Sequence, residues 1–119
     1  MIERAEQMHR QFFQPGTAAL SRASWEPPVD IFESECDLLI VVALPGVEST
    51  DIEISSGPDM LVVAGVRRLP AEARGLAIQR LEIPQGRFER RIALPSARWE
   101  LRRSTLTEGC LLISLTRQA

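Results

Sequence analysis

The pattern of hydrophobic and polar residues divides the chain into two parts. A short N-terminal part has the spacing of a helix, and a longer part consists of short apolar runs separated by turn residues. A short amphipathic helix is predicted in residues 1–13, ending at Pro15-Gly16. Its apolar residues recur at spacings of three and four, at Ile2, Ala5, Met8 and Phe12. A helix of about three turns is marginal alone. We therefore expect an N-terminal arm, residues 1–24, that makes its contacts through Ile2, Met8, Phe12 and Phe13.

From Val29 onward, short apolar runs alternate with turn residues. Strands are expected at 29–32, 38–44, 51–54, 60–66, 87–94, 101–106 and 110–116. Closely spaced runs rich in Val, Ile and Leu predict an antiparallel sandwich. The expected fold class is all-β, an immunoglobulin-like antiparallel β-sandwich of seven or eight strands over residues 25–117 with a short N-terminal helical arm. Residues 118–119 then end the chain with no C-terminal extension.

The connection Leu69–Gln85 is long for so small a domain, and a connection of that length is often functional. It holds prolines and a glycine around a weak strand at Leu76–Ile83. Such an isolated strand is stable only if it pairs with a sheet edge.

Three glycines lie at positions that predict the local backbone conformation. Pro45-Gly46 suits a type II turn, because proline presets φ and glycine accepts a positive φ. Gly109 is expected to do the same in the last hairpin. Gly65 lies inside an expected strand, where glycine indicates a close backbone approach or a bulge.

Residue composition, net charge and cysteine spacing further limit the classes of protein to which this chain can belong. The 119 residues fit one domain, and 45% hydrophobic with 25% charged residues can form an ordinary core. A net charge of -2 disfavours nucleic acid as a partner. Cys36 and Cys110 have neither disulfide-framework nor metal-ligand spacing, which indicates reduced thiols. With no signal peptide and no apolar run long enough to span a membrane, the expected location is the cytoplasm.

Residues for catalysis are missing from the sequence. The single histidine, His9, lies in the expected arm helix, and the absence of lysine excludes a P-loop lysine and a Schiff base. The carboxylate pairs Glu33/Glu35 and Asp51/Glu53 are i, i+2 pairs, each typical of one solvated strand face. We expect no enzyme activity, no cofactor and no metal site.

Five segments in order resemble the alpha-crystallin domain of the small heat-shock protein family, in its bacterial form. They are Trp25–Glu33, Leu38–Ile54 with Leu-Pro-Gly-Val, Leu61–Arg67, Gly86–Pro95, and Ser104–Leu111, where Ser104 replaces the family's alanine. The resemblance implies an ATP-independent chaperone, a holdase that binds partly unfolded client proteins. The alternative is a CS-type co-chaperone or adaptor without holdase activity, although such relatives generally lack the loop strand.

The resemblance also implies which residues bind partners. A dimer interface is expected at Arg90, Leu76, Ile78 and Arg80, with the loop strand crossing to the other subunit. Strand alternation places Arg90 on an apolar face, where an unpaired charge is costly. A groove for clients or for the tail of another small heat-shock protein is expected at Ile52, Ile54, Leu101 and Leu106. Since no tail motif follows residue 117, we expect a homodimer or a few joined dimers.

Overall fold

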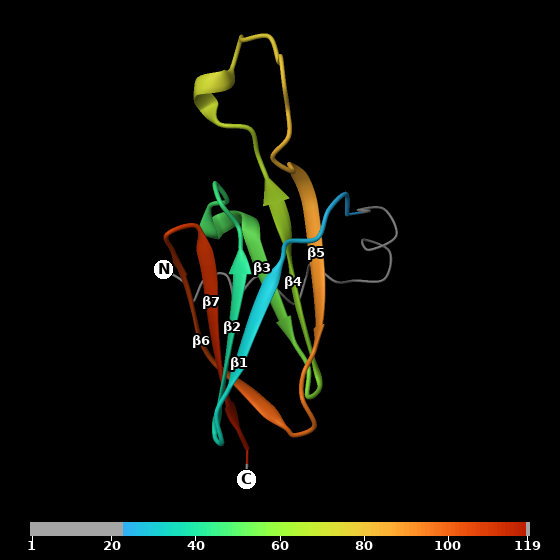
Figure 1. Cartoon of the computed structure of the whole chain (residues 1–119), viewed down its shortest axis with the longest axis vertical. Helices are drawn as coiled ribbons and strands as arrows, with labels where there is room; N and C mark the ends of the chain where they lie inside the picture. The colour runs from blue at the N-terminus through green and yellow to red at the C-terminus, as the bar shows by residue number, and fades with distance from the viewer. Residues whose placement is uncertain (1–22, 119) are drawn as a thin grey trace.

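Residues 23–118 are described by the computed structural model, and they fold into two packed antiparallel sheets (Figure 1). The strands are β1 (Val29–Glu33), β2 (Asp37–Ala43), β3 (Ile52–Ser56), β4 (Met60–Arg67), β5 (Gly86–Ala93), β6 (Trp99–Thr107) and β7 (Cys110–Arg117). One sheet has the order β1-β2-β7-β6 and the other β3-β4-β5. The predicted all-β sandwich is thus confirmed, while the helix predicted in residues 1–13 lies outside the described residues.

Strand alternation explains how the two sheets bury a common core. On β2 and β7 every second residue is buried and its neighbours are more exposed. The buried side chains of these two strands are Leu38, Ile40, Val42, Leu111, Ile113 and Leu115. Because side chains in a strand point alternately to opposite faces, the same pattern fixes which residues remain on the outer face.

Two predicted turns have the expected backbone. Gly46 has φ +76°, and the amide of Val47 donates to the carbonyl of Leu44, as in a type II turn. In the β6–β7 hairpin both Glu108 and Gly109 have positive φ, 51° and 78°. Positive φ at both central residues is the type I′ geometry, which matches the twist of a two-residue hairpin.

Gly65 lies where strand β4 passes very close to another part of the backbone. A Cβ at this position would overlap the carbonyl oxygen of Asp51 and lie 2.8 Å from Cζ of Phe88. The close approach predicted from a glycine inside a strand is therefore confirmed.

Ser104 is the polar side chain that the core accommodates least well. It lies on the inner side of β6, is 1% exposed, and its Oγ has no hydrogen-bond partner among residues 23–118. A buried hydroxyl without a partner costs about 1–3 kcal/mol. We expect Ser104→Ala to raise the free energy of unfolding by about 1 kcal/mol. Urea unfolding of this variant and of Ser114→Ala, a control on the outer face, measures the difference; equal values for the two contradict the prediction.

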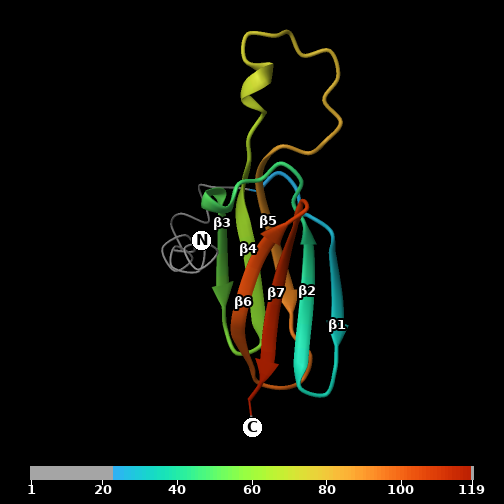
Figure 2. The ribbon, with the colours of Figure 1, turned by 90° about the vertical axis from the view of Figure 1, so that its left-hand side faces the viewer.

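The long connection between β4 and β5 projects from one end of the sandwich (Figure 2). It contains one short 3-10 turn, η2 (Ala71–Ala73), and a positive φ at Gly75. The strand predicted at Leu76–Ile83 does not form in this single chain. The segment has no sheet edge beside it, so its backbone groups lack the ladder that a strand requires.

Candidate functional site

Large aliphatic side chains gather on the projecting loop. Leu76, Ile78, Leu81 and Ile83 are between 49% and 68% exposed. Isolated exposed apolar residues are ordinary, but four within residues 76–83 concentrate apolar surface on one short segment, which indicates a protein-binding site. Among the described residues, the neighbouring Arg80 pairs with Glu82 at 3.1 Å on the surface, a contact that contributes little to stability.

Two arginines hold the base of this loop to the sandwich. Arg67 Nε donates to the carbonyl of Pro45 at 2.8 Å, and its Nη1 donates to the carbonyl of Pro84 at 3.2 Å. Arg68 forms a two-pronged pair with Asp51, through Nε at 3.0 Å and Nη2 at 3.2 Å. Within residues 23–118 these side-chain bonds tie the stem of the loop and leave its apolar part without such ties.

Strand β1 is an open edge of the four-stranded sheet within the part of the chain that is described, since it pairs only with β2. It also exposes Ile31 and Phe32, 43% and 55% accessible. An unpaired edge with apolar side chains can receive another strand.

In the three-stranded sheet, the edge strand β5 is partly covered by the segment that precedes β1. Trp25 packs on Phe88 with ring centroids 5.2 Å apart, and its carbonyl accepts from the amide of Glu89. Arg90 is half-buried there, and its Nη1 donates to the carbonyl of Pro27 at 3.1 Å. The charge that alternation placed near the apolar face thus reaches the rim of the sandwich, where it binds a backbone carbonyl instead of a carboxylate.

The residues expected to line a groove do not share one environment. Ile52 and Ile54 on β3 are completely buried in the core, whereas Leu101 and Leu106 on β6 are partly exposed and pack against it. The two isoleucines therefore belong to the core of this chain, and the groove itself stays a prediction. Both point inward because they alternate with the outward Glu53.

Glu53 is the described carboxylate with the most perturbed environment. Burial raises its pKa, and the positive charge of Arg87 partly opposes this shift. The described residues contain no group of three or more His, Cys, Asp or Glu side chains that could hold a metal ion. Cys36 and Cys110 are free thiols at opposite ends of the β2–β7 ladder, too far apart to be joined within one chain.

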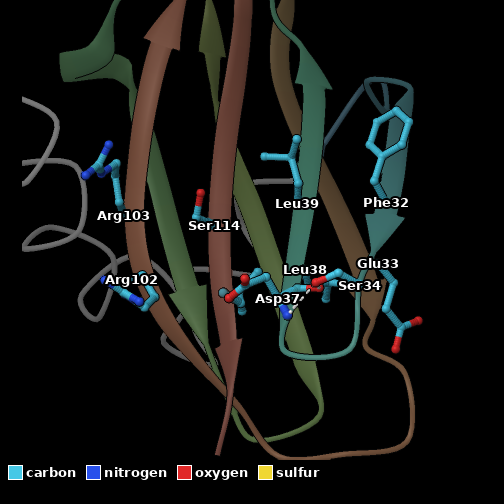
Figure 3. A pocket seen from close by; sticks show the side chains of 10 residues that line it. Phe32, Glu33, Ser34, Asp37, Leu38, Leu39, Arg102, Arg103 and Ser114 are labelled. Carbon is cyan, nitrogen blue, oxygen red and sulfur yellow. Dashed lines mark hydrogen bonds between the residues drawn. The ribbon is translucent and has the colours of Figure 1, made fainter.

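Sequence reasoning missed one feature, a shallow hollow of about 560 Å³ on the outer face of the four-stranded sheet (Figure 3). Phe32, Leu39, Arg103 and Ser114 contribute to its lining from four different strands. Leu39 and Phe32 had been expected only as members of apolar runs. Their exposure follows from alternation once the inward residues are known.

A two-sheet sandwich with a protruding apolar loop and an open strand edge offers surfaces to which other polypeptide chains can bind. The model of the Hsp20/alpha crystallin family matches residues 30–119. The chain therefore belongs to that family, the small heat-shock proteins, and the resemblance seen in its motifs is confirmed.

Individual relatives agree with this assignment. A 17.9 kDa class II heat shock protein of Helianthus annuus is 33% identical over 76 residues, which cover 63% of this chain and 48% of the relative. The chain thus spans about half the length of the curated relatives that it matches. A small heat-shock protein from Xylella fastidiosa aligns with a TM-score of 0.69 at 29% identity over 82% of this chain and 90% of that one. HspA from Xanthomonas axonopodis aligns with a TM-score of 0.66 at 27% identity over 81% and 97%.

None of the helices in residues 23–118 has the length and apolar character needed to cross a bilayer.

Proposed function

We propose that this protein is an ATP-independent chaperone that binds partly unfolded proteins and limits their aggregation. The observation that carries the proposal is exposed apolar surface outside the loop in a member of this family: Phe32 and Leu39, 55% and 36% exposed, lie in the hollow on the outer face of the four-stranded sheet. Partly unfolded proteins expose apolar segments, and burying these against such a surface is favourable without any nucleotide or cofactor.

Self-association is part of the same proposal. In a homodimer the loop segment containing Leu76, Ile78 and Arg80 adds as a strand to the open β1 edge of a second copy. Strand addition satisfies the backbone groups that both segments leave unpaired. Arg90 lies close by, because it is bonded to the carbonyl of Pro27, two residues before β1 begins. The Xylella fastidiosa relative is described as having a distinct high order structure, and a cytoplasmic dimer or a few joined dimers is proposed here.

Light scattering of a heat-labile enzyme, with and without the chain, tests the chaperone activity. We expect scattering to fall as the chain approaches an equimolar ratio to the enzyme, with the same result in the presence and absence of ATP. Ovalbumin at equal mass serves as the inert control. If several heat-labile proteins aggregate at an unchanged rate even with the chain in molar excess, the proposal fails and the adaptor function takes its place.

A further inference from the structure

Strand β4 is buried on both of its faces, whereas buried and more exposed residues alternate along β2 and β7. The inward residues Leu61 and Val63 belong to the core between the two sheets. Val62 and Ala64 point to the outer face, are 9% and 0% exposed, and lie outside that core. On the outer face of the other sheet, Leu39 is 36% exposed. Something on the outer face of the three-stranded sheet therefore covers this part of β4.

The outer face of the β3-β4-β5 sheet has the form of a trough. Its floor is the apolar row along β4, formed by Met60, Val62, Ala64 and Val66. Its walls are longer polar side chains of the two neighbouring strands, namely Glu53 on β3 and Arg87, Glu89 and Arg91 on β5. At about 3.3 Å per residue the floor is roughly 20 Å long. A segment of that length with one apolar side fits between the two walls.

The two walls differ in charge. The β5 wall carries two arginines and one acid, and Glu89 pairs with Arg91 at 2.9 Å. The β3 wall is acidic, and Oε1 of Glu53 is buried with no hydrogen-bond partner among residues 23–118. Burial also raises the pKa of Glu53. A carboxylate oxygen on an open surface would keep its water, so this wall is covered too and lacks a donor.

The first thirteen residues of the chain have the pattern that this trough requires. At about 100° per residue, the apolar residues of the helix predicted there fall within one arc, which also contains His9. These apolar residues are Ile2, Ala5, Met8, Phe12 and Phe13. From residue 2 to residue 12 such a helix is about 15 Å long, which matches the floor. Arg4 lies at one border of the arc, and Glu6 and Arg10 lie at the other.

The described chain begins beside this trough. The amide of Ser24 donates to the carbonyl of Arg87 at 2.8 Å, at the start of β5. The eleven residues from Phe13 to Ser24 can reach up to about 36 Å, whereas three strands are only about 10 Å across. The arm can therefore reach the whole trough, and so short a tether keeps it at a high local concentration there.

The handedness of a helix gives the direction in which the arm matches the walls. Ser24 lies at the loop end of the sandwich, where β4 ends, so the shortest link belongs to a helix that runs parallel to β4 (Figure 1). Seen from outside with β4 running upward, β5 is on the left and β3 on the right, which is the reverse of the view in Figure 2. A right-handed helix laid apolar side down in this direction has Glu6 on its left, toward the arginines of β5. Arg4 is then on its right, toward Glu53. The opposite direction would place like charges together.

We propose that the N-terminal arm, residues 2–13, lies as a helix in the trough of its own chain and covers the outer face of the β3-β4-β5 sheet. Its apolar side packs on Val62 and Ala64, and Arg4 supplies the donor that the buried oxygen of Glu53 lacks. This contact goes beyond the proposed chaperone function. It uses neither the projecting loop nor the hollow on the other sheet.

The rate at which a thiol at position 62 reacts with N-ethylmaleimide tests the cover. The full chain carries Val62→Cys in a Cys36→Ser/Cys110→Ser background, so that it has a single thiol. Adding Met8→Asp/Phe12→Asp places two charges against the apolar floor and should release the arm. We expect labelling to become at least about tenfold faster, because the loss of two buried apolar contacts exceeds the 1.4 kcal/mol that corresponds to this factor. Urea midpoints check that the sandwich stays folded.

Leu112→Cys in the same background is the matched control. Leu112 lies on the outer face of the other sheet, so its labelling rate should not change when the arm is altered. The charge pair is tested with the thiol at position 62. Arg4→Glu and Glu53→Arg should each speed labelling about twofold to fivefold, as expected for a partly exposed pair. The double variant Arg4→Glu/Glu53→Arg restores opposite charges and should return the rate toward that of the unaltered arm.

Three results would overturn the inference. Labelling that is unchanged by Met8→Asp/Phe12→Asp would mean that the neighbouring side chains alone cover Val62. Labelling that slows as the protein concentration rises would mean that the arm of a second copy fills the trough, contrary to an intrachain contact. A double charge variant that labels as fast as the single ones, with an unchanged urea midpoint, would remove the pairing of Arg4 with Glu53 and with it the direction of the helix.

Discussion

Replacing Gly65 by alanine is expected to destabilise the protein by about 3 kcal/mol or more, since overpacking a filled site usually costs 1–3 kcal/mol and here one obstacle is backbone. The added methyl group would overlap the carbonyl oxygen of Asp51 and press on the ring of Phe88. Neither obstacle is a flexible side-chain end, so strand β4 or the turn at Asp51 has to move. A loss of this size is a large share of the stability of a small domain.

Gly57→Ala is the matched control for this change. Gly57 lies in the β3–β4 connection, and a Cβ there would meet only the carbonyl oxygen of Met60, at the ordinary distance of 3.6 Å. Urea unfolding of both variants should show a large shift of the midpoint for Gly65→Ala and almost none for Gly57→Ala. A Gly65→Ala variant within about 1 kcal/mol of the unaltered chain would mean that the strand relaxes easily, contrary to our expectation.

Replacing both Leu76 and Ile78 by serine is expected to weaken dimerisation by at least about 100-fold without changing the stability of the folded chain. Burying one such side chain contributes about 1.5–3 kcal/mol, so losing two on each subunit removes well over the 2.8 kcal/mol that corresponds to a factor of 100. In the single chain both side chains are more than 60% exposed, so their loss leaves the core intact.

Sedimentation equilibrium of this double variant gives the change in dissociation constant. Gln79→Ser, at the position that follows Ile78, is the control for a serine in the loop and should dimerise normally. A double variant that dimerises as tightly as the unaltered chain would show that the loop does not form the interface. Thermal unfolding at a concentration where both chains are monomeric checks that the sandwich itself is unaffected.

Most of the strand content could be predicted from the order of residues alone. The period of two along β2 and β7 identifies both the strands and their buried faces, because alternate side chains of a strand point to opposite sides. Pro45-Gly46 and Glu108-Gly109 identify turns, because few other residues adopt a positive φ. The boundaries were less certain, and Asp51, expected in a strand, lies in the short 3-10 turn η1 (Ser49–Asp51).

The partners of individual side chains were beyond sequence reasoning. Alternation placed Arg90 near the apolar face, but its bond to the carbonyl of Pro27 depends on where the segment before β1 crosses β5. The deep burial of Ile52 and Ile54 could not be predicted for a related reason. Membership of a strand does not say how deeply the two sheets enclose its inward side chains.

The sequence by itself determined the all-β class, the turns, the position of Gly65 as a close approach, and the family. Each of these depends on residues that are neighbours in the chain or on a local backbone preference. Only the tertiary structure decided that β2 and β7 lie at the centre of one sheet. It also decided that the bulge before Arg103 leaves two arginines at the edge of this sheet, and that Phe32 and Leu39 lie in the same cross-strand row as Arg103. Those relations come from pairing between distant strands, where the register is set by packing of the whole core and not by any local pattern.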